Sequence, residues 1–242
     1  MKFQLVARRL IIPTVLLCAL VAAVSVRGAE YEAGLITFAR VRGKVEVRFN
    51  KESHRAQNGT QGVAGVTIES APGSQAVIVF ANGSAALISG GSLFTVRAFR
   101  IIPFPSPNRS LYRLRQEPSI SQTNIQFERG EITFFIRNLH KDSEFAVVTP
   151  FGSIWPRPDK VNYASTFLLR DSGSGRTLAV WKGSIDWKSP TRREETIEGD
   201  RHVFFNADLE PLVANGLEWT YVRLFERRMF AMEAVMKKFR LK

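Results

Sequence analysis

The feature that most constrains the fold of this chain is a series of short runs of β-branched and aromatic residues between Leu35 and Val213, separated by Gly, Asn, Ser and Pro. Residues 44–49 alternate strictly between polar and apolar, which is typical of a strand with one buried face. Asn82-Gly83 predicts a type I′ turn that closes one hairpin. Roughly a dozen strands at this spacing predict an all-β fold, either solenoid-like or a sandwich of many short strands.

A proline-rich segment interrupts this pattern at residues 103–118. It holds four of the chain's 11 prolines, and proline cannot donate to the hydrogen-bond ladder of a sheet. We therefore expect an extended surface insertion within a single β domain that covers residues 30–215.

The spacing of the apolar residues changes to that of a helix after Gly216. Residues 216–242 are basic and lack proline, and their apolar residues recur at steps of three and four, which predicts an amphipathic helix. Leu224 and Phe230 widen an apolar stripe made of Val222, Phe225, Met229, Met232, Met236 and Phe239. The β domain, a partner protein or a membrane surface must cover so large an apolar area. The three methionines in the stripe favour a partner.

Residues 1–28 have the composition of an export signal. Three basic residues precede an uncharged run over residues 10–26, whose most hydrophobic part covers residues 10–24. A membrane span needs about 20 apolar residues, so this shorter stretch favours a cleaved signal peptide over an anchor in the inner membrane. Both alternatives export the β domain, and we expect it in the periplasm. Only nine residues precede the apolar run, so we expect no cytoplasmic domain there.

The charge balance narrows the kinds of partner that the protein suits. Its 242 residues include 34 Lys and Arg against 22 Asp and Glu, for a net charge of +12. Such a charge suits an anionic polymer, a phospholipid surface or nucleic acid. We expect no nucleic-acid partner, because an exported protein rarely meets one and the sequence has no recognition-helix motif. The single cysteine, Cys18, excludes intramolecular disulfides and cysteine-rich zinc sites.

The residue types that carry catalysis are few and scattered along the sequence. None of the three histidines (His54, His140 and His202) has another ligand at a recognised metal-binding spacing. The sequence has no Gly-x-Ser-x-Gly motif and no glycine-rich phosphate loop, so we predict no catalytic residue, no cofactor and no metal site. A catalytic set whose residues are distant in sequence and are brought together only by the fold remains an open alternative. Trp155, beside Pro156, is the best candidate for an exposed ring that stacks on a sugar.

Part of the β region resembles a known family. Residues 73–84 run from a Gly-Ser-x-Ala strand start to an Asn-Gly-Ser turn and resemble the central signature of the FecR domain. Further pieces follow in the family's order across residues 35–190. The residues that carry the resemblance are Gly73, Ser74, Ala76, Asn82, Gly83, Ser84, Gly130, Thr149, Pro150, Thr166, Phe167 and Gly183. Ser165 departs from the pattern, because the family usually has glycine at that place.

The resemblance implies an all-β, solenoid-like domain on the outer side of a cytoplasmic membrane. In better-known FecR proteins a membrane span joins this domain to a cytoplasmic anti-sigma domain, for which we expect no room here. The resemblance therefore implies a non-enzymatic domain that binds another envelope protein, with Trp155 and the apolar stripe as candidate contact residues. The alternatives are a module that binds cell-wall glycan or peptidoglycan through Trp155 and, less favoured, an enzyme acting on envelope carbohydrate.

Overall fold

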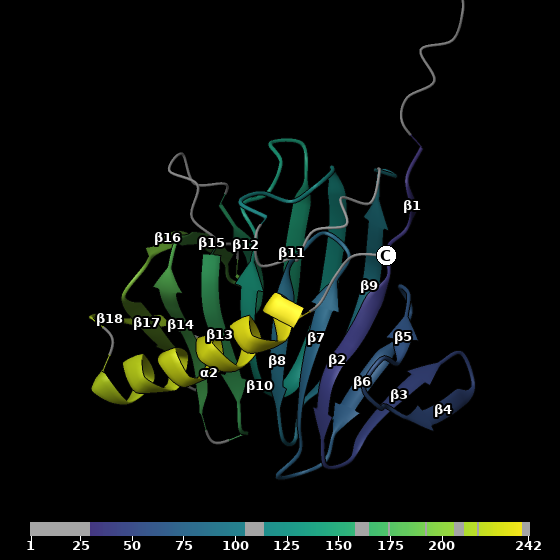
Figure 1. The fold of residues 1–242 in the computed structure, drawn as a ribbon. Helices are drawn as coiled ribbons and strands as arrows, with labels where there is room; N and C mark the ends of the chain where they lie inside the picture. Colours follow the sequence, from purple (N-terminus) through teal and green to yellow (C-terminus); the bar gives the residue numbers. More distant parts are fainter. Residues whose placement is uncertain are drawn as a thin grey trace, which may run out of the picture. The chain divides into compact units, whose positions relative to one another are not determined.

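Two β-sheets face each other across an apolar core in the computed structural model (Figure 1). The structure describes residues 30–104, 114–157, 165–173, 175–191, 193–205, 211–216 and 218–238. The expected signal or anchor at residues 1–28, part of the proline-rich segment, and Phe239 lie outside the described residues. The two facing sheets confirm the predicted all-β fold and show that it is a sandwich.

The two sheets share one strand, β10. Sheet A has the order β4-β3-β6-β9-β10-β11-β12-β15-β16, with β1 also beside β9. Its strands are β1 (Glu32–Ala33), β3 (Val45–Phe49), β4 (Glu52–Arg55), β6 (Thr67–Ser70), β9 (Leu93–Ile101), β10 (Ser121–Ile136), β11 (Glu144–Thr149), β12 (Gly152–Pro156), β15 (Ser184–Lys188) and β16 (Glu194–Glu198). Sheet B has the order β5-β2-β7-β8-β10-β13-β14-β17-β18. Its other strands are β2 (Ile36–Arg42), β5 (Gln61–Gly62), β7 (Gln75–Phe80), β8 (Ala85–Ser89), β13 (Ser165–Asp171), β14 (Arg176–Lys182), β17 (Arg201–Phe205) and β18 (Pro211–Asn215).

The long strand β10 bends from sheet A into sheet B at Gly130. Its first half, from Ser121 to Arg129, pairs with β9, and its second half, from Gly130 to Ile136, pairs with β13. Gly130 has a φ of 94°, a conformation that L side chains rarely adopt. A Cβ at this position would lie 2.5 Å from Ser92 Oγ and against the backbone of Ser92. Both constraints require glycine, so the bend depends on this residue.

The same close contact between a glycine and a serine recurs where the chain crosses between sheets elsewhere. A Cβ on Gly183, between β14 and β15, would lie 2.7 Å from Ser165 Oγ. A Cβ on Gly43, between β2 and β3, would lie 2.5 Å from Ser74 Oγ. Ser165, which departs from the FecR pattern, thus occupies the same kind of corner position as Ser74.

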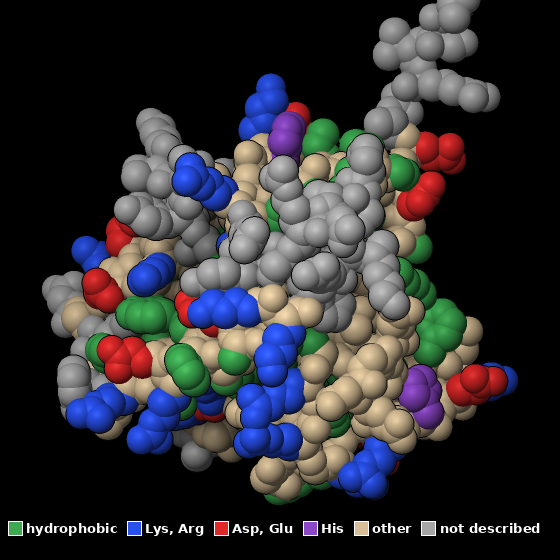
Figure 2. Space-filling view, in the orientation of Figure 1, with side chains coloured by type: hydrophobic (Ala, Val, Ile, Leu, Met, Phe, Trp, Pro, Cys, Tyr) green, Lys and Arg blue, Asp and Glu red, His purple; other side chains and the backbone are tan. Residues whose placement is uncertain are grey.

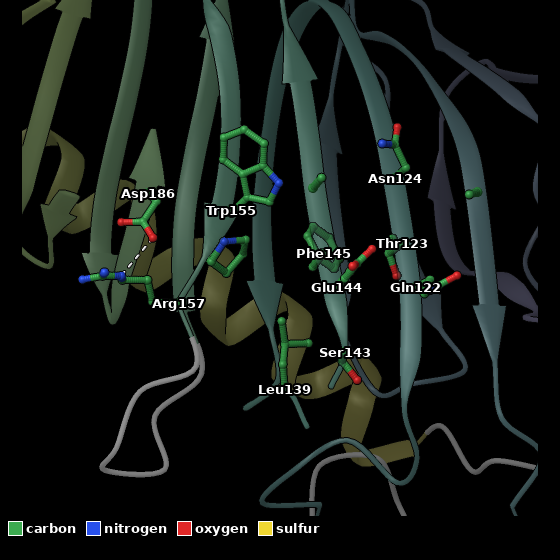
Figure 3. Close-up of a pocket in the computed structure, with 13 residues that line it drawn as sticks. Gln122, Thr123, Asn124, Leu139, Ser143, Glu144, Phe145, Trp155, Arg157 and Asp186 are labelled. Carbon is green, nitrogen blue, oxygen red and sulfur yellow. Dashed lines mark hydrogen bonds and ion pairs between the residues drawn. The ribbon is translucent and has the colours of Figure 1, made fainter. Parts of the chain in front are cut away.

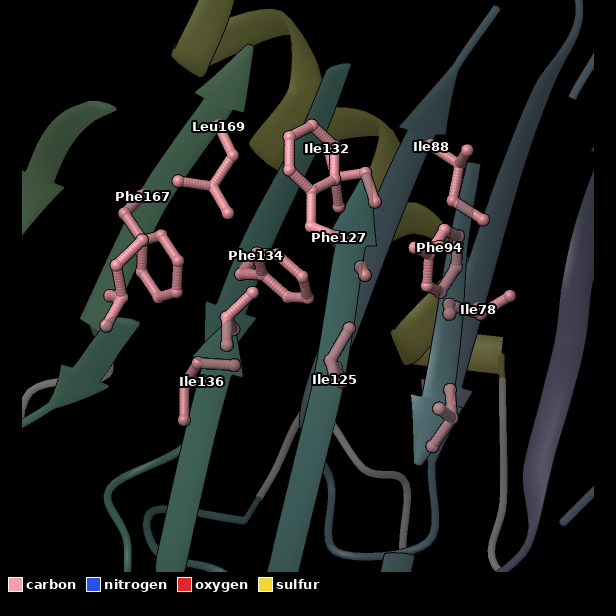
Figure 4. Close-up of a cluster of buried hydrophobic side chains, with 14 of the residues drawn as sticks. Ile78, Ile88, Phe94, Ile125, Phe127, Ile132, Phe134, Ile136, Phe167 and Leu169 are labelled. Atoms are coloured by element: carbon pink, nitrogen blue, oxygen red, sulfur yellow. The ribbon is translucent and has the colours of Figure 1, made fainter. Parts of the chain in front are cut away.

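Inward-facing side chains of both sheets build the core (Figure 4). Phe94 and Phe127 come from sheet A, and Phe134 and Phe167 come from sheet B. All four are fully buried, and the rings of Phe134 and Phe167 stack with their centroids 5.1 Å apart. Full burial of a large apolar side chain contributes ~1.5–3 kcal/mol, so apolar burial is what holds the two sheets together.

Helix α2 (Trp219–Lys238) lies across the outer face of sheet B (Figure 1). In its first half, Phe225 is fully buried against Leu168 of β13, and its ring stacks on that of Trp181 with centroids 5.7 Å apart. In its second half, Met232 and Met236 are buried against β7 and β8. Sheet B is therefore covered on both faces, by sheet A on one side and by α2 on the other.

The position of α2 corrects two expectations about its apolar stripe. The β domain itself covers Phe225, Met232 and Met236, so these side chains are not accessible to a partner protein, and Met229 is half-buried with them. Phe230 was expected to widen the stripe, but it is 76% exposed. Phe230 precedes Met232 by two residues, or about 200° around the helix, which places it on the opposite side.

A buried arginine fastens the middle of α2 to the bend of β10. Arg228 donates hydrogen bonds from Nη1 to Thr133 Oγ1 at 2.5 Å and from Nη2 to Ser89 Oγ at 3.1 Å. Its Nη2 also forms an ion pair with one carboxylate oxygen of Glu131, while the other oxygen pairs with Arg170. Burial lowers the pKa of the Arg228 guanidinium to about 10, so the group stays charged at neutral pH. The carboxylate of Glu131 is therefore needed to balance a buried charge.

Two phenylalanines on α2 give a matched test of how the helix docks. Phe225→Ala should lower the free energy of unfolding by ~3–5 kcal/mol, because it removes a fully buried ring. Phe230→Ala should change it by no more than ~0.5 kcal/mol, because that ring lies in solvent. Denaturant unfolding of the two variants measures the difference. Equal losses would show that α2 does not pack on sheet B as described.

Candidate functional site

Trp155 stands on the outer face of sheet A among polar side chains (Figure 3). It lies in β12 directly opposite Asp186 of β15, which in turn lies opposite Thr196 of β16. The Trp155 residue is 38% exposed. Among the described residues, no helix covers this face of sheet A. The ring is therefore accessible, as its position beside Pro156 suggested.

A hollow of about 530 Å³ lies beside Trp155, over β9, β10 and β11. Short side chains, Ala98 and Ala146, form part of its lining and leave the space open. The amide side chains of Gln122 and Asn124 project from β10 (Figure 3), and Asn124 lies between Ala98 of β9 and Ala146 of β11. The hollow thus combines an aromatic ring with amide donors and acceptors, a lining that suits a ligand with both an apolar face and polar groups.

A second hollow, of about 420 Å³, shares Trp155 and extends toward β16. Asp186 lines both hollows, and its carboxylate is held in place by two hydrogen bonds. Thr196 Oγ1 donates to Oδ1 at 2.8 Å, and Arg157 Nε donates to Oδ2 at 2.9 Å. With both oxygens held, Asp186 presents a fixed polar edge beside the Trp155 ring.

The turn that carries the FecR resemblance is buried at the end of the β7–β8 hairpin. Asn82 Oδ1 accepts a hydrogen bond from the backbone N of Ser84 at 3.0 Å, and Asn82 Nδ2 donates to Ser121 Oγ at 3.1 Å. Ser84 Oγ accepts from the backbone N of Arg137 at 3.2 Å. Among the described residues, Asn50 and Asp200 alone have a positive φ without being glycine, so the expected type I′ turn at Asn82-Gly83 is wrong. The Asn82 side chain instead links this turn to the start of β10.

The same network reaches a buried carboxyl group, Glu117. Its Oε2 accepts a hydrogen bond from Ser121 Oγ at 2.7 Å, and its Oε1 accepts from the backbone N of His140. Burial raises the pKa of Glu117, although hydrogen bonds from Ser143 and Ser121 act in the opposite direction. The residue is 5% exposed, whereas the sequence placed it in a surface insertion. Local sequence around Pro118 contains no signal of this burial, because the segment that closes over the carboxyl, at His140, lies 23 residues further along the chain.

The raised pKa of Glu117 predicts a pH-dependent stability. This group's contribution to stability is fully present below its ordinary pKa near 4.5 and is lost as pH rises through the raised value. Relative to Glu117→Gln, the wild type should therefore lose unfolding free energy between pH 4 and pH 7. Denaturant unfolding at both pH values measures the difference. Glu128→Gln, an exposed carboxyl on β10, controls for the lost charge, and parallel pH profiles of the wild type and Glu117→Gln would contradict the prediction.

The other family-motif residues belong to the scaffold. Thr149 Oγ1 donates to the carbonyl of Gly152 at 2.7 Å and accepts from the backbone N of Phe151, which closes the turn after Pro150. Thr166 and Phe167 are buried in β13. None of the motif residues is among those that line the two hollows beside Trp155. The motif residues are Gly73, Ser74, Ala76, Asn82, Gly83, Ser84, Gly130, Thr149, Pro150, Thr166, Phe167 and Gly183.

The three histidines lie apart from one another. His140 Nδ1 is 3.6 Å from the carboxylate of Asp142, and His202 stacks on the ring of Tyr221 with centroids 5.6 Å apart. His54 lies on β4. Within the described part of the chain, no group of three or more His, Cys, Asp or Glu side chains could hold a metal ion. In the same part of the chain, no helix is both long enough and apolar enough to cross a membrane.

Comparisons with known proteins give a distant structural likeness. No protein-family profile matches the sequence, and no curated protein matches it. Two crystal structures of a provisionally assigned anti-sigma factor from Parabacteroides distasonis ATCC 8503, at 2.50 and 1.65 Å resolution, are similar to this chain with TM-scores of 0.46 and 0.45. Each is 12% identical in sequence and aligns with 66% of this chain. The aligned regions span 63% and 64% of those two chains.

Proposed function

We propose that the protein is a non-enzymatic binding module of the bacterial cell envelope that engages another envelope protein through the outer face of sheet A. The ordered resemblance to FecR domains across residues 35–190 supports a role in interaction. The basic start and the uncharged run at residues 10–26 support export to the periplasm, as a cleaved signal or as an inner-membrane anchor.

The observation that carries this proposal is the unequal covering of the two sheets. Helix α2 buries the outer face of sheet B, and with it the apolar stripe that the sequence offered as a docking element. On the outer face of sheet A, Trp155 is accessible between two hollows. Tryptophan is among the residue types that most often contribute a large share of the binding energy of a protein interface. We therefore place the contact surface around Trp155.

A second candidate function is the binding of cell-wall glycan, and the first hollow favours it. Its amide side chains, Gln122 and Asn124, lie on β10, with Ala146 of β11 between them and the strand that carries Trp155. A sugar can stack its apolar face on such a ring while its hydroxyls bond to amides. The basic net charge also suits an anionic wall polymer. This function would use the same surface, so one set of variants tests both.

Site-specific photocrosslinking in intact cell envelopes tests the proposal. A photoreactive amino acid at position 155 should form an adduct with another protein, whereas the same group at Glu226, exposed on α2, should not form that adduct. Adducts of equal yield at both positions, or none at position 155, would count against a protein contact at Trp155.

Co-sedimentation with purified cell-wall polymer separates the two candidates. For the glycan module, the wild type should sediment with the polymer, and Trp155→Ala should raise the dissociation constant about fivefold or more, since stacking on an aromatic ring is worth on the order of 1 kcal/mol. For a protein-binding module, the two should sediment alike. Thermal unfolding of Trp155→Ala confirms that the variant folds, because the replaced ring is partly in solvent.

A further inference from the structure

The outward side of α2 carries an exposed aromatic residue among basic ones. Arg223, Arg227, Phe230, Ala234 and Lys237 follow one another at steps of four and three, which places them on one side of the helix. All five are exposed. Phe230 is 76% exposed, well above the 46% of Leu35, the next of the exposed large apolar side chains among the described residues. A phenylalanine this exposed costs free energy in water unless another apolar phase receives it.

The charges on the outward side of α2 are of both signs, with more basic than acidic residues. The exposed basic residues of α2 are Arg223, Arg227, Lys237 and Lys238, against the acidic residues Glu226 and Glu233. Arg40 lies beside the helix on the same face of sheet B, since it pairs with Val77, which packs under α2. Figure 2 shows this face, with Lys and Arg side chains (blue) gathered along and below the helix. Glu226 and Glu233, four residues before and three residues after Phe230, flank its ring on one side, and Arg227 flanks it on the other.

We propose that this face of α2 binds the surface of an anionic phospholipid bilayer. The ring of Phe230 would enter the boundary between headgroups and acyl chains, and the exposed Arg and Lys side chains of α2 would contact lipid phosphates. A single protruding ring on a convex helix needs no shaped pocket when the receiving phase is lipid. This is why we choose a bilayer over a partner protein, which would have to supply such a pocket.

The mode of binding differs from that of a free amphipathic helix. The apolar face of α2 is already buried on sheet B, and Arg228 holds the helix there through Glu131, Thr133 and Ser89. Phe230 is therefore presented by a docked helix that does not have to leave the β domain. The sandwich places sheet B between α2 and sheet A, so a membrane on the outer side of α2 would leave the Trp155 surface free for its own ligand. This inference does not depend on what that ligand is.

A fluorescent probe at residue 230 of the full chain tests the proposal. In a Cys18→Ser background, Phe230→Cys carries an environment-sensitive dye, and Phe49→Cys, 39% exposed on β3, carries the same dye as a matched control. With vesicles of phosphatidylglycerol and phosphatidylethanolamine, the dye at residue 230 should shift to the blue and brighten several-fold. Phosphatidylcholine vesicles should produce no such change, and the dye at residue 49 should respond to neither. The dye reports the surroundings of residue 230 itself, so insertion of residues 10–26 into vesicles does not produce the signal.

Variants that change the charge of α2 test whether anionic lipid is what the helix binds. Glu226→Gln should strengthen the response at residue 230, and Arg227→Gln should weaken it, each about two- to fivefold, because anionic lipids attract the net positive charge near the surface. Added salt should reverse binding by screening. The proposal is overturned by an equal response to phosphatidylcholine, by no response to the anionic vesicles, or by an equal response at residue 49. An equal response to a soluble anionic polymer would also overturn it and would indicate a polyanion site.

Discussion

The three layers of this protein meet at Glu131, the residue directly after the bend of β10. Its backbone N donates to Ser92 Oγ at 2.9 Å, and Ser92 Oγ donates to its carbonyl at 3.0 Å, which ties the bend to the start of β9. Its carboxylate pairs with Arg228 of α2 and with Arg170 of β13. The bend itself exists because Gly130 has no Cβ to collide with Ser92. One glycine and one carboxylate thus join sheet A, sheet B and the helix.

This junction decides which surfaces of the molecule are open. Since Arg228 is charged and buried, α2 is held over sheet B by an ion pair as well as by its apolar stripe. The apolar stripe of α2 is therefore buried within the molecule. On the outward side of α2, Phe230 is exposed on a face with several basic side chains. On the outer face of sheet A, Trp155 is exposed among polar side chains. The two proposals rest on these two separate surfaces, and both depend on the helix staying docked.

Periodicity predicted the elements of this fold well and their mutual arrangement only in part. The alternation at residues 44–49 predicted a strand that is found as β3, and steps of three and four predicted the helix that is found as α2. The same steps marked an apolar face without identifying what covers it, because the β-strand surface that receives Phe225 comes from residues far away in sequence. The predicted type of the Asn82-Gly83 turn was wrong, because the Asn82 side chain bonds to the backbone N of Ser84 and to Ser121 Oγ, and its φ is not positive.

The candidate site, too, could be predicted from the sequence only where the signal is local. The exposure of Trp155 followed from its neighbour Pro156, a local signal. The hollow beside it did not, because it depends on the register of several strands that brings Ala98 and Asn124 together across β9 and β10. The burial of Glu117 could not be predicted from the sequence either, since its partner His140 is brought to it by the fold.

The central claim is that the pair of Arg228 and Glu131 holds the helix on the β domain, and a double-mutant cycle tests it most directly. Glu131→Gln should lower the free energy of unfolding by ~3–5 kcal/mol, because it leaves the buried charge of Arg228 without a carboxylate. Arg228→Met should lower it less, because Glu131 keeps its ion pair with Arg170. The double variant should be no less stable than Glu131→Gln alone, because it also removes the unpaired guanidinium. Losses that simply add in the double variant would show that the two residues do not interact and would contradict the account.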